Sequence, residues 1–196
     1  MNLLRNPVLT IVVALAFAAS PASAQEEMDE ADIIESRPAD DIDSLLAELA
    51  DPDLRTWEAT EARIIELWSR SGSATADLLL ERGMNALEAE DYLTAVEHLT
   101  ALTDHAPDFA EGWHARATAF YLQEEFGLAV RDLQRALVLN PRHFGALTGL
   151  GIVLEELGDY ELALRALELA EDLNPHRATV TDGIARLKAR IGESTL

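Results

Sequence analysis

The stretch from Phe126 to Pro141 reads FGLAVRDLQRALVLNP, and two other stretches of the chain follow the same pattern. Tyr92 to Pro107 reads YLTAVEHLTALTDHAP, and Tyr160 to Pro175 reads YELALRALELAEDLNP. All three open on an aromatic residue, carry alanine fourth and leucine eighth, and end on proline. Because they start 34 residues apart, the chain contains a sequence repeat of that period.

The half of each unit that precedes the aromatic residue keeps the same phase. Gly83, Ala117 and Gly151 stand 34 residues apart, and all three are small. A small residue lets two helices approach closely, the aromatic residue opens the second helix, and proline ends it because it lacks the N–H that a helix interior needs. Each unit is therefore predicted to be a pair of helices.

These units resemble the tetratricopeptide repeat family, whose units place Trp or Leu fourth, a small residue eighth, an aromatic residue seventeenth, Ala twentieth and Pro thirty-second. In that register the units are residues 76–109, 110–143 and 144–177. The fourth positions then hold Leu79, Trp113 and Leu147. Arg82 and Arg116 depart from the family by occupying its usually apolar seventh position. The resemblance implies an all-α fold, a right-handed α-solenoid of helix-turn-helix repeats.

Helical patterns flank the repeats on both sides. Residues 178–192 are predicted to form a C-terminal capping helix, with Val180, Ile184 and Leu187 on its apolar face. Residues 40–72 are predicted to form an N-terminal helical hairpin, because apolar residues recur at helical spacing on either side of Asp51-Pro52, an N-cap followed by proline. This hairpin is a possible degenerate repeat.

The N-terminus has the pattern of an export signal. Arg5 precedes an apolar run, and Ala22-Ser23-Ala24 supplies the small residues that a signal peptidase reads. We expect residues 1–24 to be cleaved, leaving no membrane insertion, and the acidic residues 25–39 to be a disordered linker. The expected location is the periplasm, with secretion as the alternative.

Charge and missing motifs exclude several functions. The net charge of -21 repels phosphate backbones, so nucleic acid is excluded as a partner. The chain has no Cys and contains no Gly-x-Ser-x-Gly, no Gly-rich phosphate loop and no His-Glu-x-x-His. We therefore expect no catalytic residues and no cofactor in this acidic protein.

The resemblance also implies where a partner binds, since the first helix of each unit lines a concave groove in this family. The implied peptide-binding residues are Leu80, Met84, Glu88, His114, Thr118, Tyr121, Thr148 and Ile152. Their mixture of apolar groups with a carboxylate suits a partner segment that is apolar with some basic residues. The alternative is that half of the groove residues pack on neighbouring helices or under the hairpin.

Two kinds of site are not expected: a clamp for a C-terminal carboxylate, and a metal site. Some family members hold a C-terminal carboxylate with Lys, Asn and Arg, and here the corresponding faces offer Leu80, Met84, Thr148 and Ile152. No metal site is expected, because His98, His105 and Asp104 do not converge as zinc ligands must. His143 and His176 stand beside inter-unit turns, where solvated side chains are expected.

The leading hypothesis is a non-catalytic adaptor that binds a protein or peptide in its groove. One alternative is a structural protein of the cell envelope that self-associates, giving a homodimer through the apolar faces at residues 33–49 and 54–68. The other is an enzyme of the cell envelope, although no motif supports it.

Overall fold

The computed structural model describes residues 41–194, which form helices joined by short turns, with no strand in that range. The helices are α2 (Ile42–Leu49), α3 (Trp57–Trp68), α4 (Ala74–Glu88), α5 (Tyr92–His105), α6 (Ala110–Leu122), α7 (Phe126–Leu139), α8 (Phe144–Glu156), α9 (Tyr160–Leu173) and α10 (Ala178–Ser194). The all-α prediction is confirmed. The expected signal peptide, 1–24, and linker, 25–39, lie outside the described residues.

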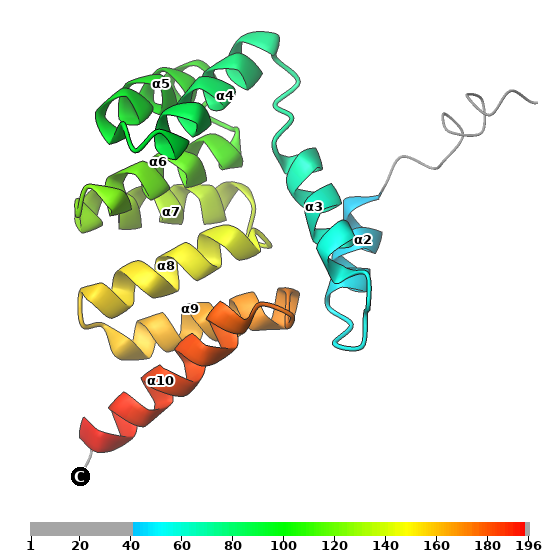
Figure 1. Ribbon diagram of the computed structural model, residues 1–196, viewed down its shortest axis with the longest axis vertical. Helices are drawn as coiled ribbons and strands as arrows, with labels where there is room; N and C mark the ends of the chain where they lie inside the picture. Colours follow the sequence, from blue (N-terminus) through cyan, green and yellow to red (C-terminus); the bar gives the residue numbers. More distant parts are fainter. Residues whose placement is uncertain (1–40, 195–196) are drawn as a thin grey trace, which may run out of the picture. The chain divides into compact units, whose positions relative to one another are not determined.

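Helices α4 to α9 form three antiparallel pairs that stack in chain order, and α10 packs on α9 (Figure 1). The small residues explain the close pairing. A Cβ built on Gly151 of α8 would lie 2.4 Å from Cδ2 of Leu167 of α9, and one on Gly83 of α4 would lie 2.5 Å from Cδ2 of Leu99 of α5. Larger side chains at these positions would force the helices apart.

The turns inside the three pairs share one backbone geometry. Glu90, Glu124 and Gly158 stand at the same phase of the repeat, with φ of 58°, 61° and 83°. The next residue donates its N–H to a carbonyl five residues back, as Glu125 does to Phe120 at 2.9 Å. This is the Schellman arrangement, which satisfies the last carbonyls of a helix and needs one left-handed residue.

The hairpin of α2 and α3 packs against the third repeat. Leu46, Leu49 and Ile64 are buried together with Phe144 of α8, and Leu173 of α9 packs on the same cluster. The hairpin therefore packs on the third repeat and does not stack on α4. Its apolar stripe is buried instead against the N-terminal end of α8 and the C-terminal end of α9 (Figure 1).

No helix within the described range is both long enough and apolar enough to cross a lipid bilayer.

Candidate functional site

Two connected cavities lie along the first helices of the second and third repeats. The larger, about 350 Å³, is bounded by α3, α6, α8 and the start of α10. The smaller, about 270 Å³, continues along α6 and α8. His114, Gly149 and Ile152 line both, so the two cavities form one groove, which we call the α6–α8 groove.

The hairpin supplies one wall of this groove. The indole of Trp68 stacks on the ring of His143, with centroids 4.6 Å apart, and lies 5.0 Å from the ring of Phe144. Ile65 of α3 also faces the larger cavity and is 41% exposed, so the wall is apolar and open to a ligand. The groove is thus built from both the repeats and the segment that precedes them.

A buried carboxylate ties this wall to the end of the third repeat. Glu61 of α3 is 4% exposed and accepts hydrogen bonds from Nδ2 of Asn174, at 3.0 Å, and Nε of Arg177, at 2.8 Å. Nε2 of His176 lies 3.2 Å from the carbonyl oxygen of Leu49. These polar contacts hold α3 in place because an unpaired buried carboxylate would cost several kcal/mol, roughly 3 to 5.

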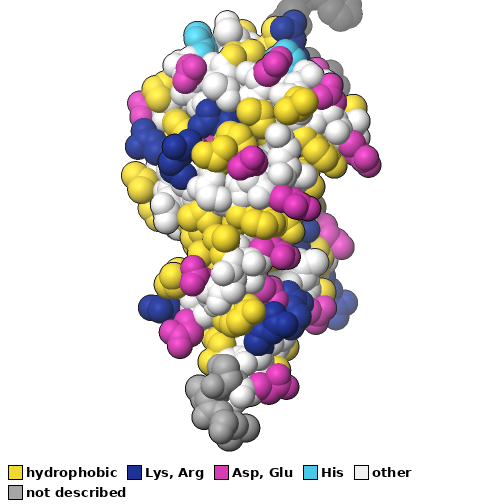
Figure 2. Space-filling model, turned by 90° about the vertical axis from the view of Figure 1, so that its left-hand side faces the viewer, with side chains coloured by type: hydrophobic (Ala, Val, Ile, Leu, Met, Phe, Trp, Pro, Cys, Tyr) yellow, Lys and Arg dark blue, Asp and Glu magenta, His cyan; other side chains and the backbone are white. Residues whose placement is uncertain are grey.

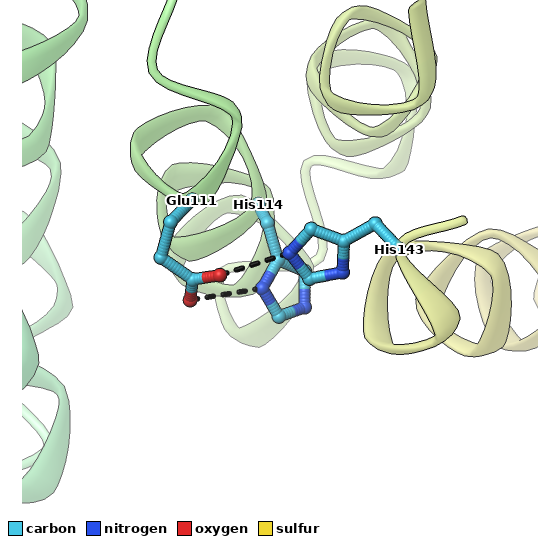
Figure 3. A group of neighbouring side chains, drawn as sticks. All are labelled: Glu111, His114 and His143. Carbon is cyan, nitrogen blue, oxygen red and sulfur yellow. Dashed lines mark hydrogen bonds and ion pairs between the residues drawn. The ribbon is translucent and has the colours of Figure 1, made fainter. Parts of the chain in front are cut away.

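Three polar side chains meet at the edge of the groove, as Figure 3 shows. Glu111 of α6 lies between two histidines: its Oε1 is 3.2 Å from Nδ1 of His114, and its Oε2 is 2.8 Å from Nε2 of His143. The His143 side chain is 4% exposed and that of His114 is 24% exposed. His143 therefore forms the buried end of this cluster and His114 its open end.

Charge in the cluster resides on the carboxylate. Burial by itself raises the pKa of Glu111, but the charge interaction and hydrogen bond with His114, together with the hydrogen bond and charge interaction with His143, outweigh it and lower the pKa from 4.5 to about 2. Burial lowers the pKa of His143, and its hydrogen bond to Glu111 offsets only part of that effect. At neutral pH the cluster thus contains an ionised Glu111 beside a neutral His143.

Hydrogen bonding also fixes the tautomer of His143. Its Nδ1 accepts the backbone N–H of Ala146 at 3.1 Å and so caps α8. A neutral imidazole carries one proton, so Nε2 is protonated and donates to Glu111.

The potential ligand atoms of Glu111, His114 and His143 all lie within 4.8 Å of one another. Within the described range, this is the group that could hold a metal ion. The donor set of two histidines and a carboxylate suits Zn²⁺. However, metal binding at Nε2 of His143 would require the proton to move to Nδ1, which is already accepting from Ala146. In this arrangement the cluster fits a hydrogen-bond network better than a metal centre.

The predicted groove residues separate into two groups. His114, Thr118, Tyr121, Thr148 and Ile152 line the α6–α8 groove. The three from the first repeat do not: Leu80 is 7% exposed within a core cluster, while Met84 and Glu88 are exposed on α4 outside both cavities. The cavities therefore involve the second and third repeats.

Sequence reasoning missed the residues that the hairpin brings to the groove, namely Glu61, Ile65 and Trp68. It was also wrong about two histidines, since His143 is 3% exposed and the His176 ring stacks on Trp57 with centroids 5.4 Å apart. Both lie under the hairpin instead of in solvent. The apolar stripe of α3 was the available signal, but the sequence does not say which surface it covers.

A different face carries the turns within the pairs, and Figure 2 views the molecule from that side. Hydrophobic side chains there lie among charges of both signs. Leu93, Leu122 and Leu157, next to these turns, are 72%, 40% and 49% exposed. No continuous acidic surface covers this face, despite the net charge of -21.

Comparison with known proteins gives the same architecture. A family model described as tetratricopeptide repeat matches residues 80–132 and 114–178. A TPR repeat-containing protein of Rhizobium etli is 31% identical over 193 residues, covering 96% of this chain and 94% of that relative. The human protein SGT1 homolog is 30% identical over 104 residues, which are 53% of this chain and 28% of the human protein.

Solved structures with the same fold include the first TPR of Spaghetti (RPAP3) bound to the HSP90 peptide SRMEEVD. That structure is similar with a TM-score of 0.60 at 23% identity, over 61% of this chain and 95% of its own. The Sgt2 TPR domain from Aspergillus fumigatus also gives 0.60 at 23% identity, over 63% and 83%. At these identities the likeness concerns the fold.

Proposed function

Since this chain belongs to the tetratricopeptide repeat family, we propose that it is an exported, non-catalytic adaptor that binds a segment of another protein in the α6–α8 groove. The observation that carries the proposal is the pair of connected cavities, about 350 and 270 Å³, lined by helices of two repeats and walled by α3. Apolar anchors of a partner would be buried against Trp68, Phe144 and Ile152.

The bound peptides of two structural neighbours, SRMEEVD and SGPTIEEVD, are acidic. An acidic peptide needs unpaired basic side chains in its binding site, and this groove does not offer them. Arg177 is the one Lys or Arg among the residues that line the two cavities, and it pairs with Glu61 at 2.7 Å. We therefore propose a partner segment with apolar anchors and, because the chain carries -21 overall, basic flanking residues.

Export belongs to the same proposal. The apolar run after Arg5 and the small residues Ala22-Ser23-Ala24 support cleavage before Gln25 and a periplasmic location. N-terminal sequencing of the protein from a periplasmic fraction checks this. A chain that retains Met1 and stays in the cytoplasmic fraction would contradict it.

Photocrosslinking in cells tests the groove. A crosslinking amino acid at Thr118, which lines the smaller cavity, is expected to trap a partner, whereas one at Leu169, exposed on α9, is not. Mass spectrometry then identifies the trapped protein. Equal trapping at both positions, or at Leu169 alone, would place the partner outside the groove.

A matched pair of substitutions gives an independent readout. Ile152 and Leu169 are 36% and 55% exposed on neighbouring helices, so replacing either with Asp adds a charge to an accessible apolar position. Ile152→Asp is expected to abolish capture of the crosslinked partner and Leu169→Asp to leave it unchanged. Melting temperatures verify that both variants fold.

Self-association through the predicted apolar faces would need residues that a single chain already buries. Leu46, Leu49 and Ile64 belong to the apolar faces that were expected to form a homodimer, and all three are at most 4% exposed within one chain. Light scattering at several salt concentrations is expected to give the monomer mass.

A further inference from the structure

The protons in the Glu111 cluster determine what His114 offers to a ligand. The ionised carboxylate of Glu111 has no proton to donate, so Nδ1–H of His114 donates to it over 3.2 Å. In the neutral ring, Nε2 of His114 then carries the lone pair. No hydrogen bond to this Nε2 is made by any residue in the range 41–194.

This free acceptor belongs to a residue that lines both cavities of the groove. The ring lies against the first turn of α8, where a Cβ on Gly145 would be 3.3 Å from Nε2, so glycine leaves room for it. Thr148, one turn further along α8, donates its hydroxyl proton to the carbonyl oxygen of Phe144 at 2.9 Å. Its remaining lone pairs also make it an acceptor.

The carboxylates beside these acceptors already accept hydrogen bonds. Glu61 is paired with Arg177, and Glu111 accepts from both histidines. A charged anchor would therefore lose hydration and meet only carboxylates that already accept hydrogen bonds. The rest of the larger cavity's wall includes Trp68, Phe144 and Ile152, and its volume of about 350 Å³ accepts a bicyclic ring.

An apolar wall beside free acceptors calls for a large apolar side chain that carries a hydrogen-bond donor. We infer that the groove recognises a tryptophan side chain of the partner, whose indole N–H is donated to Nε2 of His114. Tryptophan fits because its side chain is a donor only and combines this with the largest apolar surface. The inference rests on the proposed function and names the anchor that the groove selects.

Three small probes test the donor directly on the full-length protein labelled at histidine. Indole carries the N–H, 1-methylindole lacks it, and benzothiophene lacks it without adding bulk. NMR titrations at a pH of about 8, where ordinary histidines are neutral, are expected to show indole binding about tenfold more tightly than either analogue. The resonance of His114 Nε2 should shift with indole alone.

His114→Phe keeps a ring but removes the acceptor, and it should abolish the difference among the three probes. His114→Gln, whose amide oxygen accepts, is expected to restore part of it. His98→Phe on α5, outside both cavities, is the matched control and should bind like the wild type. Each variant's melting curve verifies folding.

Equal affinity of the three probes for the wild type, or unchanged discrimination in His114→Phe, would overturn the inference. A Zn²⁺ titration that shifts both His114 and His143 and displaces indole would also overturn it, by making the cluster a metal site. Crosslinking from Thr118 tests the proposed function independently of the probes. If the three probes bind equally but the partner is still trapped at Thr118, the tryptophan inference is wrong and the adaptor function is still supported.

Discussion

Arg116 of α6 and Asp132 of α7 form a buried ion pair inside the second repeat. Nε of Arg116 lies 2.6 Å from Oδ2 of Asp132 and Nη2 lies 3.1 Å from Oδ1, with exposures of 8% and 1% for the two residues. Nη1 donates to Oγ1 of Thr103 at 2.7 Å, and the guanidinium lies 4.8 Å from the centre of the Trp113 ring. An arginine at a usually apolar position is thus fully partnered.

Removing one partner of this pair should be costly and removing both should not. Asp132→Ala leaves a buried unpaired arginine and is expected to lower the free energy of unfolding by about 3 to 5 kcal/mol. Arg116→Leu with Asp132→Ala should recover most of the loss, because Leu150 and Ala166 stand at the same phases of the third repeat. Urea unfolding checks both, and a double variant as unstable as the single one would contradict the prediction.

The shared turn geometry predicts opposite effects at equivalent positions. Glu124→Gly should raise the free energy of unfolding by about 1 kcal/mol, because the left-handed φ of 61° is sterically unfavourable for any residue with a Cβ. Gly158→Ala, at the same phase with φ of 83°, should lower it by a similar amount. Two changes of the same sign in thermal melts would refute the role of backbone strain.

Helix contact can be tested by adding one methyl group at two glycines. Gly151→Ala places a Cβ 2.4 Å from Leu167 and 3.2 Å from the carbonyl oxygen of Ala163, so it should destabilise by about 1 to 3 kcal/mol. Gly127→Ala on α7 meets nothing within 4 Å and should be neutral or stabilising. Calorimetry distinguishes the two, and equal melting temperatures would disprove the close contact.

Acid should destabilise the protein through the Glu111 cluster. The pKa of Glu111 is lowered to about 2 from 4.5, so its contribution is complete above pH 4.5 and is lost as the pH falls towards 2. The size is on the order of 3 kcal/mol, at about 1.4 kcal/mol per pKa unit. The pKa of His143 is also lowered, so the unfolded chain binds that proton first and stability already falls below about pH 6.5.

Two variants separate these steps in unfolding curves recorded at a series of pH values. Glu111→Gln should remove the loss between pH 4.5 and 2, and His143→Asn should flatten the change near pH 6.5 while its amide still accepts the N–H of Ala146. Curves parallel to the wild type across both ranges would contradict the cluster's role.

The repeats should fold without the hairpin but lose the groove. A fragment of residues 73–196 keeps the three core clusters that lie within α4 to α10, so circular dichroism should still show a cooperative melt. It loses Ile65 and Trp68 from the cavity wall, so indole binding should weaken. A fragment that melts without cooperativity, or binds indole as tightly as the full chain, would contradict this.

The repeat period and its small residues predicted the architecture because their contacts are local. Ala95, Ala129 and Ala163 are all 0% exposed, as expected where the helices of a pair touch. His114, Thr118 and Tyr121 line the smaller cavity together, since helical spacing alone puts them on one face of α6.

The placement of the hairpin required the tertiary structure. The apolar stripe of α3 predicts that this face of the helix will be buried, but it does not predict which surface will cover it. The hydrophobic effect depends on the apolar area removed from water and is not directional. Only the folded chain brings Glu61 to Arg177, and Trp68 to His143, across more than 70 residues of sequence. The sequence by itself therefore determined the repeats and one face of the groove, whereas long-range packing decided its wall, its depth and the proton positions that define its chemistry.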